Sequence, residues 1–101
     1  MDFRIIKSPS NSTKDIIRRR MSGNCKADLD SAGAIGLVQG TLIEMIYAVD
    51  IAEKASGVTV EDIRGTCPQH MILLGIFGDT SSVEAALKAI QSKMKEGKKL
   101  C

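Results

Sequence analysis

Apolar residues gather in three short runs along the later part of the chain. These are residues 34–38, bounded by Gly33 and Gly40, residues 58–64, which open on Val-Thr-Val, and residues 71–77, the most apolar run of the sequence. Short apolar runs bounded by turn residues and rich in β-branched side chains are typical of buried strands. The pattern therefore predicts one strand in each run.

Two longer segments carry apolar residues at helical spacing, and each opens on a capping box. Thr41 with Glu44, and Ser81 with Glu84, show the Ser/Thr-x-x-Glu pattern whose side chains satisfy the first free N–H groups of a helix. The first helix is predicted to run to about Ala55, with Gly57 able to take the left-handed conformation that is common after helices. The predicted apolar faces are Leu42, Met45, Ile46, Val49 and Ala52 in the first helix and Val83, Leu87, Ile90 and Met94 in the second.

The first third of the chain is more polar and less regular. Residues 3–6 predict a short strand, residues 8–12 a turn rich in Ser, Asn and Pro, and residues 13–19 a second short strand centred on two isoleucines. Residues 21–33 predict an irregular linker. The arginine run at residues 18–20 has acidic neighbours, which favours a solvated edge over a phosphate-binding site.

Together these elements predict an α+β fold, with an antiparallel sheet and two main helices on one of its faces. The other face is expected to be solvated or used in assembly. The 101 residues fit one domain. Within it, residues 1–33 supply the N-terminal strands and linker, residues 34–96 form the main region, and residues 97–101 form a flexible basic tail.

The amino-acid composition argues against several classes of function. The net charge of +2 and the three aromatic residues are a poor match for a nucleic-acid binder, which combines basic residues with aromatic stacking platforms. No apolar run approaches the roughly 18 residues of a membrane span. Three cysteines at irregular spacing do not make a disulfide framework, so a reducing, cytosolic location is expected.

Candidate chemistry lies in the polar loop between the last two predicted strands. Its residues are Gly65, Thr66, Cys67, Pro68, Gln69 and His70. Thiolate is a soft ligand suited to zinc or iron–sulfur clusters, and imidazole also suits zinc. One chain offers at most Cys67 and His70, and two ligands do not hold a metal. A metal site therefore requires that symmetry bring several copies of the loop together.

Three blocks of the sequence resemble the bacterial microcompartment (BMC) shell-protein family. They are Ala-Ile-Gly-Leu-Val at residues 34–38, Ala-Val-Asp-Ile-Ala-Glu-Lys-Ala at residues 48–55, and Ile-Phe-Gly-Asp-Thr-Ser-Ser-Val-Glu-Ala-Ala-Leu at residues 76–87. The front segment, residues 4–13, resembles the start of the circularly permuted members. Among these, the Cys-Pro pair in the loop is most similar to the shell proteins associated with glycyl-radical enzymes.

The resemblance implies a structural protein, not an enzyme, that resides in the microcompartment shell. It implies a circularly permuted BMC fold, flat cyclic hexamers that tile with other shell proteins, and an encapsulated glycyl-radical enzyme system. The loop at residues 65–70 would line a pore on the sixfold axis, where some relatives carry an iron–sulfur cluster. Cys67 is then the candidate ligand of a [4Fe–4S] cluster, and Lys54 matches the lysine that packs one hexamer against another.

Other readings of the same residues stay open. The pore could pass metabolites without any metal, or hold zinc through Cys67 and His70. The chain could instead be a small oligomeric regulatory domain that binds a ligand. A small enzyme with Cys67 as nucleophile and His70 as base is a further alternative, although no third orienting group is evident.

Overall fold

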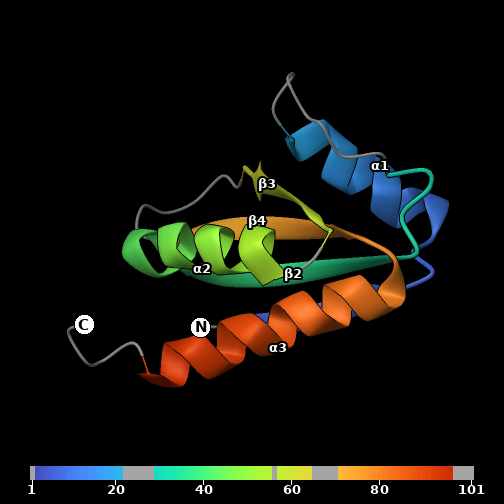
Figure 1. Cartoon of the computed structure of the whole chain (residues 1–101). Coiled ribbons are helices and arrows are strands. Elements are labelled where there is room, and N and C mark those ends of the chain that lie inside the picture. Colours follow the sequence, from blue (N-terminus) through green and yellow to red (C-terminus); the bar gives the residue numbers. More distant parts are fainter. Residues whose placement is uncertain (1, 22–28, 56, 65–70, 97–101) are drawn as a thin grey trace.

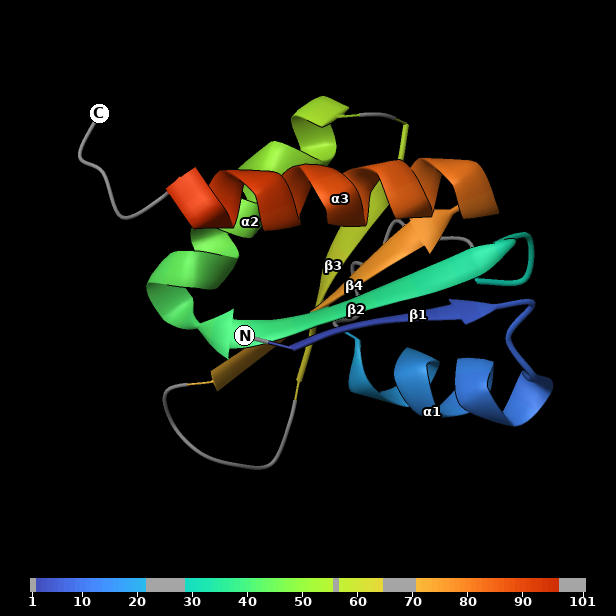
Figure 2. The same ribbon diagram turned by 90° about the horizontal axis from the view of Figure 1, so that it is seen from below.

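The structure is a computed structural model that describes residues 2–21, 29–55, 57–64 and 71–96. Its elements in chain order are β1 (Asp2–Lys7), α1 (Asn11–Arg20), β2 (Ala34–Thr41), α2 (Leu42–Ala55), β3 (Thr59–Ile63), β4 (Met71–Gly78) and α3 (Thr80–Glu96). Within these residues the strands form one antiparallel sheet in the order β1-β2-β4-β3. Helices α2 and α3 lie on one face of it, and α1 lies on the other (Figures 1 and 2). The predicted α+β fold, with two main helices on one face, is confirmed.

Alternation along the strands divides the core into two clusters, because successive side chains of a strand point to opposite faces. On the face of α2 and α3, Val38 and Ile76 pack against Met45 of α2 and Ile90 of α3. On the opposite face, the sheet residues Ile35, Ile63 and Phe77 pack against Ile17 of α1, with Met21 and Leu29. The expectation that this second face is solvated or kept for assembly is therefore wrong for the part that α1 covers.

Helix α1 replaces the second short strand predicted for residues 13–19. Its N-cap is Ser10, whose hydroxyl accepts the backbone N–H of Thr13 at 3.2 Å. Three arginines fill its last turn, where cations interact favourably with the helix dipole. The β-branched pair Ile16-Ile17 favoured a strand, but only Ile17 is buried, as one apolar face of a helix requires.

Helix α2 begins at the predicted capping box. The backbone N–H of Thr41 donates to Oε1 of Glu44 at 2.9 Å, and the N–H of Glu44 donates to the Thr41 hydroxyl at 3.4 Å. The predicted apolar face is partly wrong. Its inward residues are Met45, Ala48, Ile51 and Ala52, whereas Leu42 and Ile46 are exposed. Helix α2 ends at Ala55, as predicted, although Gly57 is not left-handed.

Helix α3 is capped two residues before the predicted cap, Ser81. Asp79 is its N-cap, since Oδ1 of Asp79 accepts the N–H of Ser82 at 2.7 Å. The predicted partner of Ser81, Glu84, instead pairs with Lys7 of β1 at 3.2 Å. The apolar stripe is confirmed: Val83, Leu87 and Ile90 are buried, and Met94 packs partly buried against the same core.

Candidate functional site

The candidate loop leaves the sheet beside the start of α2. Residues 65–70 connect β3 to β4, and Met71, the first residue of β4, pairs with Thr41, the last residue of β2. Leu42 follows Thr41 directly as the first residue of α2. The root of the loop and the first turn of α2 therefore share one end of the sheet (Figure 2).

The six predicted pore-loop residues lie outside the described residues. These are Gly65, Thr66, Cys67, Pro68, Gln69 and His70. In the described part of the chain, no group of three His, Cys, Asp or Glu side chains could hold a metal ion. The assignment of Cys67 as a metal ligand stays a prediction, and it still requires thiolates from more than one chain.

Lys54 lies in the last turn of α2 with its side chain exposed. Its Nζ is 3.0 Å from Oδ2 of Asp50, one helical turn earlier. This order, acid before base at i and i+4, favours the helix, although an exposed pair of this kind contributes little to stability. The amine is thus held on the outer surface of α2, and its role at a hexamer edge stays a prediction.

The outward side of α2 carries an apolar patch that the sequence reading missed. Its members are Leu42, Ile43, Ile46 and Tyr47, with exposed fractions of 57%, 78%, 63% and 42%. We call these four residues the α2 patch. They follow the i, i+1, i+4, i+5 spacing of one helix face. The sequence does contain a signal for this patch, because α2 is apolar on nearly every side, and such a helix is usually buried all round.

The strand end that leads into the loop is tied to the C-terminal end of α1. Met21 forms an antiparallel bridge with Ile63, and the N–H of Arg64 donates to the carbonyl of Arg20 at 2.9 Å. The two guanidinium groups each reach the opposite backbone: Arg20 Nη1 lies 3.4 Å from the Arg64 carbonyl, and Arg64 Nη2 lies 3.4 Å from the Met21 carbonyl.

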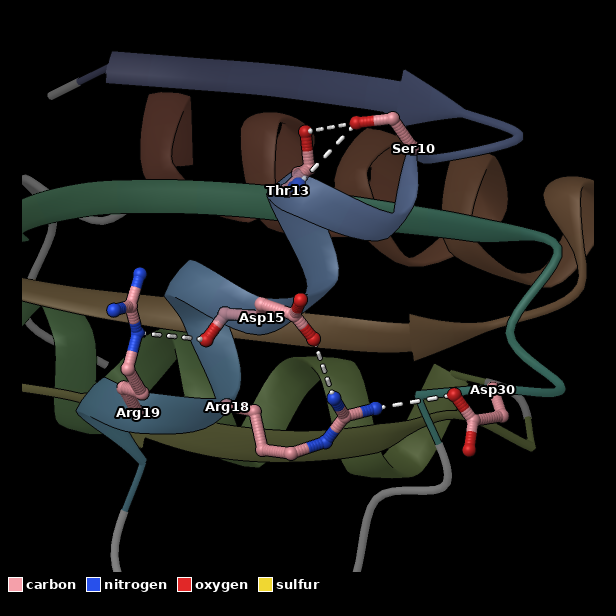
Figure 3. A network of polar contacts seen from close by, with 6 residues as sticks. All are labelled: Ser10, Thr13, Asp15, Arg18, Arg19 and Asp30. Atoms are coloured by element: carbon pink, nitrogen blue, oxygen red, sulfur yellow. Dashed lines mark hydrogen bonds and ion pairs between the residues drawn. The ribbon is translucent and has the colours of Figure 1, made fainter.

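The other two arginines of the run have different surroundings (Figure 3). Arg18 is neutralised by two carboxylates, Asp15 at 2.9 Å and Asp30 at 3.1 Å. Arg19 donates from Nε to the backbone carbonyl of Asp15 at 3.4 Å. The predicted solvated edge with acidic neighbours therefore describes Arg18 well. Arg20 is exposed as well, and its guanidinium group contacts the strand end before the loop.

Shifted carboxyl pKa values occur at helix caps. The backbone hydrogen bond from Thr41 lowers the pKa of Glu44, and the hydroxyl and N–H of Ser82 lower the pKa of Asp79. In both cases donors stabilise the ionised form. Each carboxylate accepts a hydrogen bond from a backbone N–H at the start of its helix, so its role is structural.

The fold agrees with the comparison to known proteins. Residues 34–101 match the family model of the BMC domain, so the chain belongs to the BMC-domain family of microcompartment shell proteins. This family is structural, which confirms the expectation of a shell protein that is not an enzyme. No match was found among curated protein sequences.

Two solved structures, both ligand-free GrpU microcompartment shell proteins, are similar over most of the chain. The one from Clostridiales bacterium 1_7_47FAA is 55% identical, covers 96% of this chain and 95% of its own, and has a TM-score of 0.74. The one from Pectobacterium wasabiae is 30% identical, with coverage of 89% and 99% and a TM-score of 0.71. The likeness extends beyond the matched domain into the front segment with β1 and α1.

A more distant structure shares the fold. It is a fused permuted hexameric shell protein from the RMM microcompartment, 19% identical, with a TM-score of 0.72 over 93% of this chain and 45% of its own. The predicted circularly permuted BMC fold is confirmed. In the described part of the chain, no helix is both long and apolar enough to cross a membrane.

Proposed function

We propose that the chain forms a cyclic homo-hexamer that tiles with other shell proteins, with the loop at residues 65–70 lining the pore. The observation that carries this proposal is the α2 patch, whose most exposed member is Ile43 at 78%. A contiguous exposed apolar patch marks an interaction surface. In a ring, this patch would bury against a different surface of the next copy, since head-to-tail contacts generate cyclic assemblies.

The position of the patch supports a pore at the loop. Thr41 and Met71 are paired at the end of the sheet, with Leu42 of the patch following one and the loop preceding the other. A contact through the α2 patch would therefore draw the loop roots of neighbouring copies toward one another. The hexameric shell protein with the same fold is consistent with a ring of this kind.

We further propose that the loop binds a [4Fe–4S] cluster through Cys67 of several subunits. The donor set fits in kind, because such clusters are held by thiolates, and a proline directly after a ligand cysteine is familiar from ferredoxins. It fits in number only across copies, since the loop holds one cysteine per chain. A sixfold ring offers more thiolates than a cluster takes, so some subunits would stay unliganded.

A cluster in the pore would supply electron transfer across the shell, or a source of clusters for enzymes inside it. The chemistry encapsulated would be that of a glycyl-radical enzyme system. What this chain contributes is a thiolate on a loop whose two ends are fixed by strand pairing, Ile63 with Leu73 and Met71 with Thr41. The anchored ends would present Cys67 of each copy at a similar depth along the pore.

The test is anaerobic reconstitution with iron and sulfide, followed by visible absorption and EPR spectroscopy. Wild type is compared with Cys67→Ser, and with Cys25→Ser and Cys101→Ser as matched single-cysteine controls. We expect a broad visible band that is lost only in Cys67→Ser, with the hexamer retained by light scattering in all four proteins. A colourless wild-type hexamer would leave a plain pore-forming tile. A protein that holds zinc through Cys67 and His70 would contradict the cluster equally.

A further inference from the structure

Arg20 and Arg64 lie directly opposite each other at the root of the candidate loop. Because Met21 and Ile63 form an antiparallel bridge, the adjacent residues Arg20 and Arg64 also face each other, and a 2.9 Å backbone hydrogen bond joins them. Each guanidinium group contacts a backbone carbonyl of the opposite segment, so both stay close to this junction. Like charges held close together repel each other. The arrangement therefore concentrates two positive charges that would otherwise separate.

The surroundings of these two side chains differ from those of the cations that form ion pairs. Arg18, Lys7 and Lys54 each have a carboxylate within 3.2 Å. Among the described residues, the structure pairs Arg20 and Arg64 only with backbone carbonyls. The dipole of α1 accounts for a basic residue at position 20. It does not account for Arg64, which follows β3.

We propose that Arg20 and Arg64 form a binding site for a small oxyanion, a carboxylate or a phosphate, at the mouth of the pore. Guanidinium groups present paired N–H donors that match the oxygens of such anions. Both side chains are exposed, and the carbonyl contacts hold both guanidinium groups close to the junction of α1 and β3. A bound anion would relieve the repulsion between the two charges.

This site adds to the proposed function. It depends on that function only for the arrangement of the arginine pairs around a pore. The arginine pair is complete within one chain, whereas its position around a pore requires the proposed assembly. In that assembly, symmetry repeats the pair at every loop root. A ring of positive charge at a narrow opening raises the local concentration of anions and speeds their entry. The pore would then favour anionic metabolites over neutral or cationic ones.

The test is titration of the purified protein with inorganic phosphate, and separately with succinate, by isothermal calorimetry at low ionic strength. Wild type is compared with Arg20→Gln/Arg64→Gln. The control is Lys88→Gln/Lys93→Gln, which removes the same charge from exposed positions on α3. We expect saturable binding that weakens at least about tenfold in the arginine variant and stays within about twofold in the control. The stronger of the two ligands identifies phosphate or carboxylate as the preferred chemistry.

A second variant guards against misfolding. Arg20→Lys keeps the charge and loses the planar fork, so it should bind with intermediate affinity while its circular dichroism matches wild type. Absence of saturable binding by wild type, or an equal loss in the lysine control, would overturn the site. Light scattering on the same samples separates the two proposals. A monomer that binds phosphate would refute the ring and support the arginine site. A hexamer that binds neither phosphate nor succinate would support the ring and refute the arginine site.

Discussion

The ring of Phe77 lies over Gly75 on the face of the sheet that α1 covers. A β-carbon built on Gly75 would stand 2.6 Å from Cζ of Phe77 and 2.7 Å from Cδ1 of Ile63. Distances this short are incompatible with ordinary packing, so Gly75 leaves the space into which the two larger side chains fit. Phe77 and Ile63 belong to the cluster that includes Ile17 of α1. Because Gly75 has no side chain, Phe77 of β4 and Ile63 of β3 can pack together beneath α1.

Gly75→Ala should therefore lower the free energy of unfolding by about 1–3 kcal/mol, because the added methyl group overpacks this cluster. Urea denaturation followed by circular dichroism measures the change. Gly57→Ala is the matched control, since a β-carbon there meets no atom within 4 Å and the backbone is not left-handed. It should be neutral, or more stable by up to about 1 kcal/mol. Equal stability of the two variants would contradict the packing described here.

Sequence reasoning predicted the elements whose apolar residues formed a continuous run or followed one clear helical period. The three later strands were predicted close to their observed positions, and the stripe of Val83, Leu87 and Ile90 is buried as expected. The BMC fold then followed from the order of these blocks. Local pattern sufficed in these regions because β2 and β4 are buried on both faces and therefore form continuous apolar runs, whereas α3 buries a single stripe.

Sequence reasoning failed where the local pattern was ambiguous or the relevant contact was distant. Two adjacent isoleucines suited a strand as well as a helix, so the cap at Ser10 was needed to identify α1. Helix α2 is apolar on nearly all sides, and no period could show that Met45 points inward while Ile46 points outward. The pairing of Arg20 with Arg64 joins residues far apart in the chain, which spacing does not reveal.

The caps at Glu44 and Asp79 should make stability depend on pH in the acid range. Both carboxyl groups have lowered pKa values in the folded protein, Glu44 through the Thr41 N–H and Asp79 through the hydroxyl and N–H of Ser82. Their contribution is present above the unfolded pKa values of about 4.3 and 3.9 and is lost as pH falls through the folded values.

Glu44→Gln/Asp79→Asn should accordingly be less stable than wild type near neutral pH and lose less stability below about pH 5. Thermal unfolding across a pH series measures both effects. Glu53→Gln, at an exposed position of α2, is the control and should follow the wild-type curve. Parallel curves for wild type and the double variant would show that these caps do not contribute to the acid transition.

Reversal of charge at Lys54 should impair tiling while sparing the ring. Lys54→Asp removes the exposed amine and places a carboxylate one turn after Asp50, a like-charge pair that costs the helix about 0.2–0.5 kcal/mol. We expect intact hexamers by light scattering and loss of extended sheets by electron microscopy. Lys88→Asp on α3 should leave the sheets unchanged. Normal sheets from the Lys54 variant would place the contact between hexamers elsewhere.

The α2 patch should control assembly of the ring itself. Ile43 is 78% exposed in the single chain, and burial of such a side chain contributes about 1.5–3 kcal/mol per contact. Ile43→Asp would place a charge in that contact, so we expect dissociation toward monomers in sedimentation velocity while circular dichroism stays unchanged. Ile16→Asp makes the same change at an apolar residue of α1 that is 49% exposed and lies outside the patch. It should leave the oligomer intact. If Ile16→Asp dissociates the ring and Ile43→Asp does not, the subunits meet through α1, and the α2 patch must serve a contact with another shell protein.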